Sequence, residues 1–210
     1  RIFTYLRLAE DDNSVLDKAM GHLQDAGHPI ISIDLQTRAD LAREFYRWEF
    51  ATAIAGSVLG LNPFDQPNVE AAKDATDQIL KQHINSGEPV ELSSCGSFDD
   101  LLNAAEPDHY LAITAYIQHD LRFEQFITDL RRRVMQRYKI ATTFGYGPRY
   151  LHSTGQVHKG GPPTGLFLQV VTDHHDEIRI PDRSYTFGTL VNAQAEGDFR
   201  ALKSMGRRIV

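Results

Sequence analysis

The chain has 210 residues, of which 41% are hydrophobic and 24% are charged, and its formal net charge is −6. This composition is typical of a globular protein with one medium domain or two small ones, and the negative charge argues against non-specific nucleic-acid binding without excluding a local basic pocket for a small anion. The single Cys95 excludes an internal disulfide and suits a reducing cytoplasm, and no apolar run approaches the roughly 18 residues of a membrane span.

The first elements alternate between strand and helix. We expect a strand at 2–8, an amphipathic helix at 13–27, a strand at 29–35 and a long helix at 38–60. The second strand is β-branched nearly throughout, which predicts burial on both faces. The long helix is almost entirely apolar in its second half, so we expect it to lie inside an assembly. Because the chain starts at Arg1, directly at a strand, we expect it to be a piece of a longer protein.

The same alternation continues to the C-terminus. Further helices are expected at 68–82, 97–105, 122–138 and 186–206, and further strands at 89–93, 110–117, 139–146, 166–172 and 207–210. Strands that alternate with helices predict an α/β fold, in which a mostly parallel sheet carries helices on both faces. The polar stretch 172–184, which contains His174 and His175, is expected to be an exposed loop.

A proline-rich segment, Asn62–Lys73 (NPFDQPNVEAAK), separates two of these helices. Asp65 or Asn68 can cap the second helix, which would direct its free N–H groups into the loop. Glu70 and Lys73 are spaced i, i+3 and therefore share a helix face. By themselves these residues fit either a ligand site or a proline-stiffened corner with a solvated ion pair.

A second polar segment, Gly145–Pro163, holds five glycines, three prolines and two histidines. Glycines let a backbone approach a ligand closely, and a histidine can exchange a proton near neutral pH. A loop of this length without secondary structure of its own is more often functional than idle. A functional role is therefore favoured over a plain connection. The remaining histidines lack the spacing of metal ligands, so no metal site is predicted.

Two stretches resemble the phosphoglucose isomerase family. Residues 53–73 (AIAGSVLGLNPFDQPNVEAAK) are similar to its signature, an apolar helix followed by N-x-F-D-Q-x-G-V-E-x-x-K. Asn68 stands where the family usually has glycine. Since asparagine is the commonest substitute for glycine in a left-handed backbone conformation, we expect the turn to survive. Residues 151–161 (LHSTGQVHKGG) resemble the L-H-S-x-G-Q segment of bacterial members, whose active-site histidine corresponds to His152.

The order of these two stretches resembles that of a fusion protein. In ordinary isomerases the histidine segment comes first, whereas here it follows the lysine segment. With FYRWEFATAIAG ahead and GYGPRYLHSTGQ near the end, essentially the whole chain looks like the C-terminal part of bifunctional transaldolase/phosphoglucose isomerases. This resemblance implies a sugar isomerase (SIS-like) fold, a three-layer α/β/α sandwich with a mostly parallel sheet, formed by residues 1–210 as a single domain.

The resemblance further implies interconversion of glucose 6-phosphate and fructose 6-phosphate, a step of glycolysis and gluconeogenesis, through ring opening and a cis-enediol. It assigns ring opening to Lys73 and His152, with Lys73 also stabilising charge near the ring oxygen. It places Gln66 in the sugar-phosphate site, and Ser153 and Gln156 are weaker candidates for polar groups of the pocket. Neither a metal ion nor an organic cofactor is implied.

Two parts of the family's site have no counterpart in this sequence. One is the enediol base, a Glu in an E-S-x-G-K stretch, and the other is the set of Ser/Thr-rich phosphate loops; in the fusions both lie upstream. We therefore interpret the chain as part of an isomerase that acts with the upstream isomerase and transaldolase parts. A homodimer is expected, because the family's active-site histidine comes from the neighbouring subunit. The alternatives are a non-catalytic sugar-phosphate-binding module and a piece that only supports dimerisation, and the retention of Lys73 and His152 favours the enzyme.

Overall fold

The computed structural model describes residues 2–172 and 178–210. Contacts divide the chain into two compact units, Arg1–Asp65 and Gln66–Val210, and each is described by itself. Among the described residues, no helix combines the length and the apolar character needed to cross a membrane. His174 and His175 lie outside the described residues.

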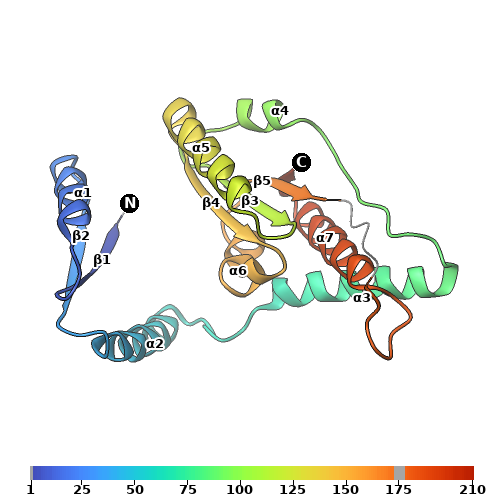
Figure 1. The fold of residues 1–210 in the computed structure, drawn as a ribbon, viewed down its shortest axis with the longest axis horizontal. Coiled ribbons are helices and arrows are strands. Elements are labelled where there is room, and N and C mark those ends of the chain that lie inside the picture. The colour runs from blue at the N-terminus through green and yellow to red at the C-terminus, as the bar shows by residue number, and fades with distance from the viewer. Residues whose placement is uncertain (1, 173–177) are drawn as a thin grey trace. The chain divides into compact units, whose positions relative to one another are not determined.

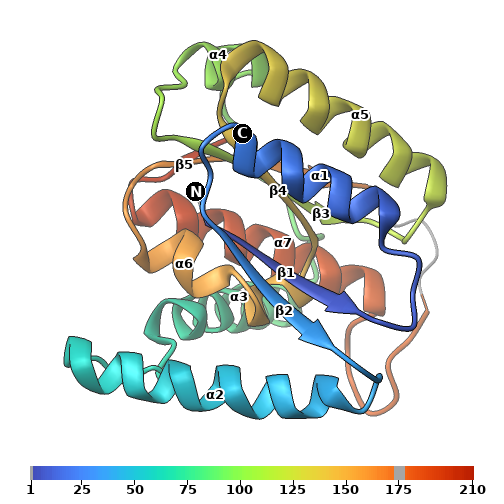
Figure 2. The same cartoon turned by 90° about the vertical axis from the view of Figure 1, so that its left-hand side faces the viewer.

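The first unit is a β-α-β-α segment: β1 (Phe3–Leu8), α1 (Ser14–Asp25), β2 (Ile30–Leu35) and α2 (Asp40–Leu59). The two strands run parallel, with Phe3 paired to Ile30 and Leu8 paired to Leu35 (Figure 2). The prediction that the second strand is buried on both faces was wrong, because only Leu35 of β2 is buried. A sheet of two strands, packed against one short helix, offers too little surface to cover both faces of a strand.

The helix α2 leaves most of its apolar side chains exposed. It ends at Gly60, whose φ of 68° is in the left-handed region that glycine adopts readily. Large hydrophobic side chains with more than a third of their surface accessible are found along its whole length: Leu41, Phe45, Tyr46, Trp48, Phe50, Ile54, Val58 and Leu59. Large exposed apolar surfaces of this kind commonly mark interaction sites.

The second unit contains a parallel four-stranded sheet of order β4-β3-β5-β6 (Figure 1). Its elements, in chain order, are α3 (Pro67–Ser86), α4 (Phe98–Asn103), β3 (Tyr110–Tyr116), α5 (Leu121–Tyr138), β4 (Ala141–Tyr146), the 3₁₀ turn η1 (Arg149–His152), α6 (Gly155–Gly160), β5 (Gly165–Val171), α7 (Phe187–Ser204) and β6 (Arg208–Ile209). The segment 145–163, expected to lack secondary structure, thus contains η1 and α6. The strand predicted at 89–93 is not formed; the Ser93 backbone N–H and hydroxyl instead donate to the Glu196 carboxylate of α7.

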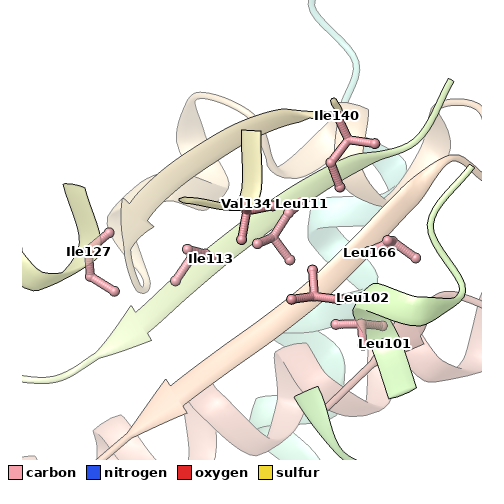
Figure 3. Packing of buried hydrophobic residues seen from close by; sticks show 8 residues of the cluster. All are labelled: Leu101, Leu102, Leu111, Ile113, Ile127, Val134, Ile140 and Leu166. Carbon is pink, nitrogen blue, oxygen red and sulfur yellow. The ribbon is translucent and has the colours of Figure 1, made fainter. Parts of the chain in front are cut away.

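Alternate residues of the central strand β3 face opposite helical layers, as a pleated strand requires. Leu111 and Ile113 pack with Ile127 and Val134 of α5 and with the α4 leucines on one face (Figure 3). Ala112 packs on the other face with Phe167 of β5 and with two residues of α7, Phe199 and Leu202. The second unit therefore has three layers, and the prediction of an α/β fold with parallel strands and helices on both faces is confirmed.

The helices α3 and α7 cross closely on the second face. A Cβ atom added at Gly197 of α7 would lie 2.5 Å from the Thr76 hydroxyl oxygen of α3, so only glycine permits this approach. The close crossing sets the position of α3, which carries the lysine of the candidate site.

Candidate functional site

The N-terminal end of α3 is built differently from the sequence-based expectation. Pro67 occupies the first helical position, where its missing N–H costs nothing. Gln66 is the N-cap residue and its side chain forms no capping hydrogen bond, so neither Asp65 nor Asn68 has the predicted capping role. Asn68 is not left-handed either, since the positive-φ residues other than glycine among the described residues are Lys139 and Asp182.

Asn68 instead forms a reciprocal amide pair with Gln156. The Gln156 side-chain N–H donates to Asn68 Oδ1 (2.6 Å), and the Asn68 backbone N–H donates to Gln156 Oε1 (3.1 Å). Gly160 lies against both side chains, and a Cβ at that position would collide with them. This pair, which we call the amide clamp, joins the first turn of α3 to α6.

Lys73 lies one and a half turns into α3 and points away from the core. Its ammonium is 2.8 Å from Glu70 Oε1, and both side chains are more than half exposed. An exposed pair of this kind contributes at most about 1 kcal/mol to stability. Lys73 is therefore available to a ligand at small energetic cost.

Lys73 and His152 line the same pocket, which has a volume of about 350 Å³. The lysine comes from α3, and the histidine comes from the end of η1, directly after β4. Polar side chains that sequence reasoning missed also line the pocket: Thr76, Asp77, Tyr185 and Gln194. Asp77 could have been found from its spacing, because residues i and i+4 share a helix face and Asp77 follows Lys73 by four. The remaining walls are apolar.

The other three predicted site residues lie elsewhere. Gln66 is exposed at the helix cap and does not line this pocket. Ser153 donates its hydroxyl to the Tyr150 carbonyl (3.1 Å) and lines a different pocket, over β3 and β4. Gln156 belongs to the amide clamp. The structure thus brings together Lys73 and His152, and it separates Gln66, Ser153 and Gln156 from them.

A buried polar network holds the segment that carries His152. Tyr150 of η1 donates its hydroxyl to Asp198 of α7, and the Lys159 ammonium is 2.5 Å from the same carboxylate. Both charged side chains are fully buried. Burial, and next the charge of Asp198, raise the pKa of Tyr150 well above its ordinary value, so this phenol stays protonated and acts as a donor.

His158, one residue before that lysine, is also buried. Its Nδ1 is 2.8 Å from the Tyr110 hydroxyl. Burial and then the Lys159 charge lower the pKa of His158 from 6.5 to about 4, so the ring is neutral at physiological pH. His158 is therefore a buried neutral residue, and His152, which is exposed, is the histidine of this segment that lines the pocket of Lys73.

Among the described residues, no group of three or more His, Cys, Asp or Glu side chains is arranged to hold a metal ion. The groups of the Lys73–His152 pocket that can carry or exchange a proton are an ammonium, an imidazole, a carboxylate and a phenol. Such a set can hold a hydroxylated anion and can move protons to and from oxygen.

Comparison with known proteins links part of the chain to one enzyme. The glucose-6-phosphate isomerase of Leptospira biflexa is 36% identical over 76 residues, which are 35% of this chain and 17% of that protein. The isomerases of Pediococcus pentosaceus (33% over 72 residues) and Heliobacterium modesticaldum (48% over 44 residues) match 33% and 21% of this chain and 16% and 10% of their own lengths. These matches span less than a fifth of each relative.

Comparison with protein-family models and with solved structures does not identify a family for this chain. No protein-family model matches the chain. The solved structure of a hypothetical protein from Thermus thermophilus aligns with 91% of this chain and 47% of its own, with a TM-score of 0.44 and 16% identity. The sequence matches therefore carry the assignment: a region of this chain is related to glucose-6-phosphate isomerases.

Proposed function

We propose that this chain supplies part of the active site of a glucose-6-phosphate isomerase. The observation that carries the proposal is that Lys73 and His152, the two catalytic candidates within the matched motifs, line one pocket although they come from different elements. The volume of that pocket is within the range of sites for small metabolites. The substrates would be glucose 6-phosphate and fructose 6-phosphate.

Ring opening is the step that these two residues fit. It requires removal of the proton from the anomeric hydroxyl and delivery of a proton to the ring oxygen as the C1–O5 bond of glucose 6-phosphate breaks. An imidazole such as that of His152 can act as the general acid–base group for these transfers. The Lys73 ammonium can stabilise the negative charge that develops on an oxygen during the transfer.

The second step moves a proton between C1 and C2 through the cis-enediol and needs a carboxylate base. We propose that this base comes from another part of the same enzyme, because the sequence has no E-S-x-G-K stretch. Asp77 is the carboxylate among the residues that line the pocket, and it is therefore the rival candidate within this chain.

The remaining details of the proposal come from the family resemblance. The partner parts would be an upstream isomerase segment and a transaldolase, joined in one cytoplasmic polypeptide that forms a homodimer. Lys73 and His152 line a common pocket within one chain, so a neighbouring subunit is not needed to bring this pair together.

A coupled assay of fructose 6-phosphate conversion tests the proposal. It would be run on this chain alone, on the chain with the upstream isomerase part, and on Lys73→Ala and His152→Ala variants of the active form. Each substitution should lower kcat/KM at least about 100-fold, the contribution typical of one proton-transfer group. Lys81→Ala is the matched control, because Lys81 is exposed on the same helix and does not line the pocket.

The outcomes separate the candidate functions. Activity that needs the upstream part and is lost in both variants supports a shared active site. Activity of the chain alone that is lost in Asp77→Asn would instead assign the base to Asp77. Tight sugar-phosphate binding without turnover in the associated parts would contradict the enzyme proposal and support a non-catalytic sugar-phosphate-binding module.

A separate experiment tests which step His152 serves, as distinct from how much it contributes to the overall rate. Glucose 6-phosphate deuterated at C2 slows only the proton transfer that forms the enediol. If His152 serves ring opening, its loss makes ring opening limiting, and the isotope effect on kcat should shrink relative to the native enzyme. An undiminished isotope effect in the slowed variant would exclude a ring-opening role.

A further inference from the structure

A second pocket, of about 330 Å³, lies at the N-terminal end of α7. Two arginines, Arg179 and Arg183, line it together with His83 from the last turn of α3 and with the hydroxyl side chains of Ser184 and Thr189. We call it the arginine pocket. It takes no part in the ring-opening chemistry described above.

The loop that carries the two arginines is closed by backbone and side-chain contacts. Arg179 and Thr186 form an antiparallel bridge, and the Phe187 N–H donates to the Ile178 carbonyl (2.9 Å). At the end of the loop Thr186 caps α7, its hydroxyl oxygen accepting from the Thr189 N–H (3.1 Å). The arginines are thus attached to a closed loop at the start of a long helix.

The histidine of the pocket is held in a similar way. His83 Nδ1 lies 2.6 Å from the Glu88 carbonyl oxygen, which can only accept, so Nδ1 carries the proton. Among the described residues, the other ring nitrogen, Nε2, has no hydrogen-bond partner.

Among its described lining residues, the arginine pocket carries positive charge and no acidic side chain. Within the same described part of the chain, neither Arg179 nor Arg183 has a hydrogen-bond or ion-pair partner for its guanidinium. Asp182, between them in sequence, is exposed and does not line the pocket. By contrast, Arg7 and Arg47 are paired with carboxylates.

Two exposed arginines thus line one concave pocket in a protein of net charge −6. Two like charges that line one concave pocket repel one another and raise the local potential, and both effects are relieved when an anion binds between them. The positive end of the 18-residue helix α7 adds to this potential.

We propose that the arginine pocket binds a phosphate monoester group. A guanidinium presents its N–H donors in a planar fork that matches phosphate oxygens, and two such forks neutralise a dianion. The hydroxyls of Ser184 and Thr189 provide further polar contacts of the kind that fix orientation. The small volume suits a metabolite rather than a macromolecule. Tyr185 lines both this pocket and that of Lys73 and His152, so the two pockets adjoin, while their charged residues differ. The proposal does not depend on the isomerase function.

Titration of the full chain with inorganic phosphate, and separately with glucose 6-phosphate, tests the proposal by calorimetry or by phosphorus NMR. The variants are Arg179→Ala, Arg183→Ala and the double substitution. Arg133→Ala is the matched control, because Arg133 is an exposed arginine of the same unit that is remote from the pocket lining. Circular dichroism verifies that each variant is folded.

Saturable binding of phosphate is expected, with affinity reduced at least about tenfold by each single substitution and unchanged in Arg133→Ala. Glucose 6-phosphate binding that is equally sensitive shows that the site accepts a phosphate monoester. Absence of saturable binding by the native chain, or its persistence in the double variant, would overturn the proposal.

A Lys73→Ala variant separates this site from the proposed active site. Phosphate affinity that survives Lys73→Ala and falls in the arginine variants assigns the anion to the arginine pocket. The opposite pattern would place the anion beside Lys73 and refute the second site. Because neither pattern measures turnover, a failure of the isomerase assay leaves this result interpretable.

Discussion

At the scale of single residues, the feature with the largest desolvation cost is the buried ion pair of Lys159 and Asp198. Both side chains are removed from water, and their attraction offsets much of the cost of desolvation only while both are present. Tyr150 adds a hydrogen bond to the same carboxylate. The pair therefore ties α6 and η1 to α7 and supports the segment that carries His152.

Replacing Asp198 by Asn should destabilise the chain by about 3–5 kcal/mol, because the Lys159 ammonium then lacks its counter-charge. Urea unfolding measures this loss. Adding Lys159→Met to Asp198→Asn removes the uncompensated charge, so the double variant should be more stable than Asp198→Asn alone. A double variant that is less stable than the single one would contradict the assignment of a paired buried charge.

His158 predicts a dependence of stability on pH. Its pKa is 6.5 when the chain is unfolded and about 4 in the fold, so the unfolded state binds the proton more readily. The contribution of the neutral ring is complete above pH 6.5 and is lost as the pH falls towards 4, by about 3 kcal/mol in total. The difference in unfolding free energy between the native chain and His158→Gln, measured across this range, should shrink on acidification. A difference that does not change with pH would exclude this titration.

Residue-scale prediction from sequence had a basis only where a chemical motif was present. Lys73 and His152 were both singled out from their motifs, and both line the candidate pocket, although their roles stay predictions. The burial of Lys159 and Asp198 left no such signal, because a charged residue in sequence gives no sign of a partner in a distant element. Gln156 belongs to a matched motif, yet its side chain serves the amide clamp.

At the scale of elements, the amide clamp fixes how α3 meets α6. Gln156→Ala would leave the Asn68 backbone N–H and side-chain oxygen without partners, at a cost of about 1–3 kcal/mol. Chemical denaturation should detect this loss, whereas Gln78→Ala, at an exposed position of α3, should change stability by less than about 0.5 kcal/mol. The KM for a sugar phosphate should be unchanged in the folded variant. A raised KM in a fully folded Gln156→Ala variant would instead support the predicted contact between Gln156 and the sugar phosphate.

The accuracy with which helices and strands were predicted depended on how regular the hydrophobic pattern of each segment is. The strand at 110–117 and the helix at 122–138 were predicted within a residue of β3 and α5, since one is continuously apolar and the other is amphipathic. Residues 89–93 have strand-forming composition but pair with a side chain of α7 instead of another strand. Tertiary contacts of that kind are not encoded in local periodicity.

At the scale of the whole molecule, the chain comprises two units of very different burial. The described core clusters lie in Gln66–Val210, whereas the first unit exposes a row of large apolar side chains along α2. The sequence predicted that this helix lies inside an assembly. That expectation stays a prediction, because it concerns a partner.

The single tryptophan gives a direct measurement. Trp48 of α2 is 45% exposed, so its fluorescence in the isolated chain should be red-shifted and readily quenched by acrylamide. If the upstream isomerase part covers α2, mixing the two should shift the emission to the blue and reduce quenching. Emission that is unchanged while the two parts are shown to associate would place the contact elsewhere. Val58→Trp in a Trp48→Phe background reports on the other end of the same helix.

Because the amide clamp fixes α3 at Asn68, the number of residues between Asn68 and Lys73 decides where the lysine side chain points. Each residue rotates an α-helix by about 100°, so the direction of Lys73 depends on the number of residues that separate it from Asn68 at the amide clamp. One residue inserted or deleted in that interval would leave the chemistry of the segment almost intact and would turn the ammonium about 100° away from His152. The number of residues in this interval is thus itself a determinant of the pocket. A related sequence can vary at the exposed positions Glu70 and Ala71 so long as that number is kept, whereas Val69 and Ala72 are buried.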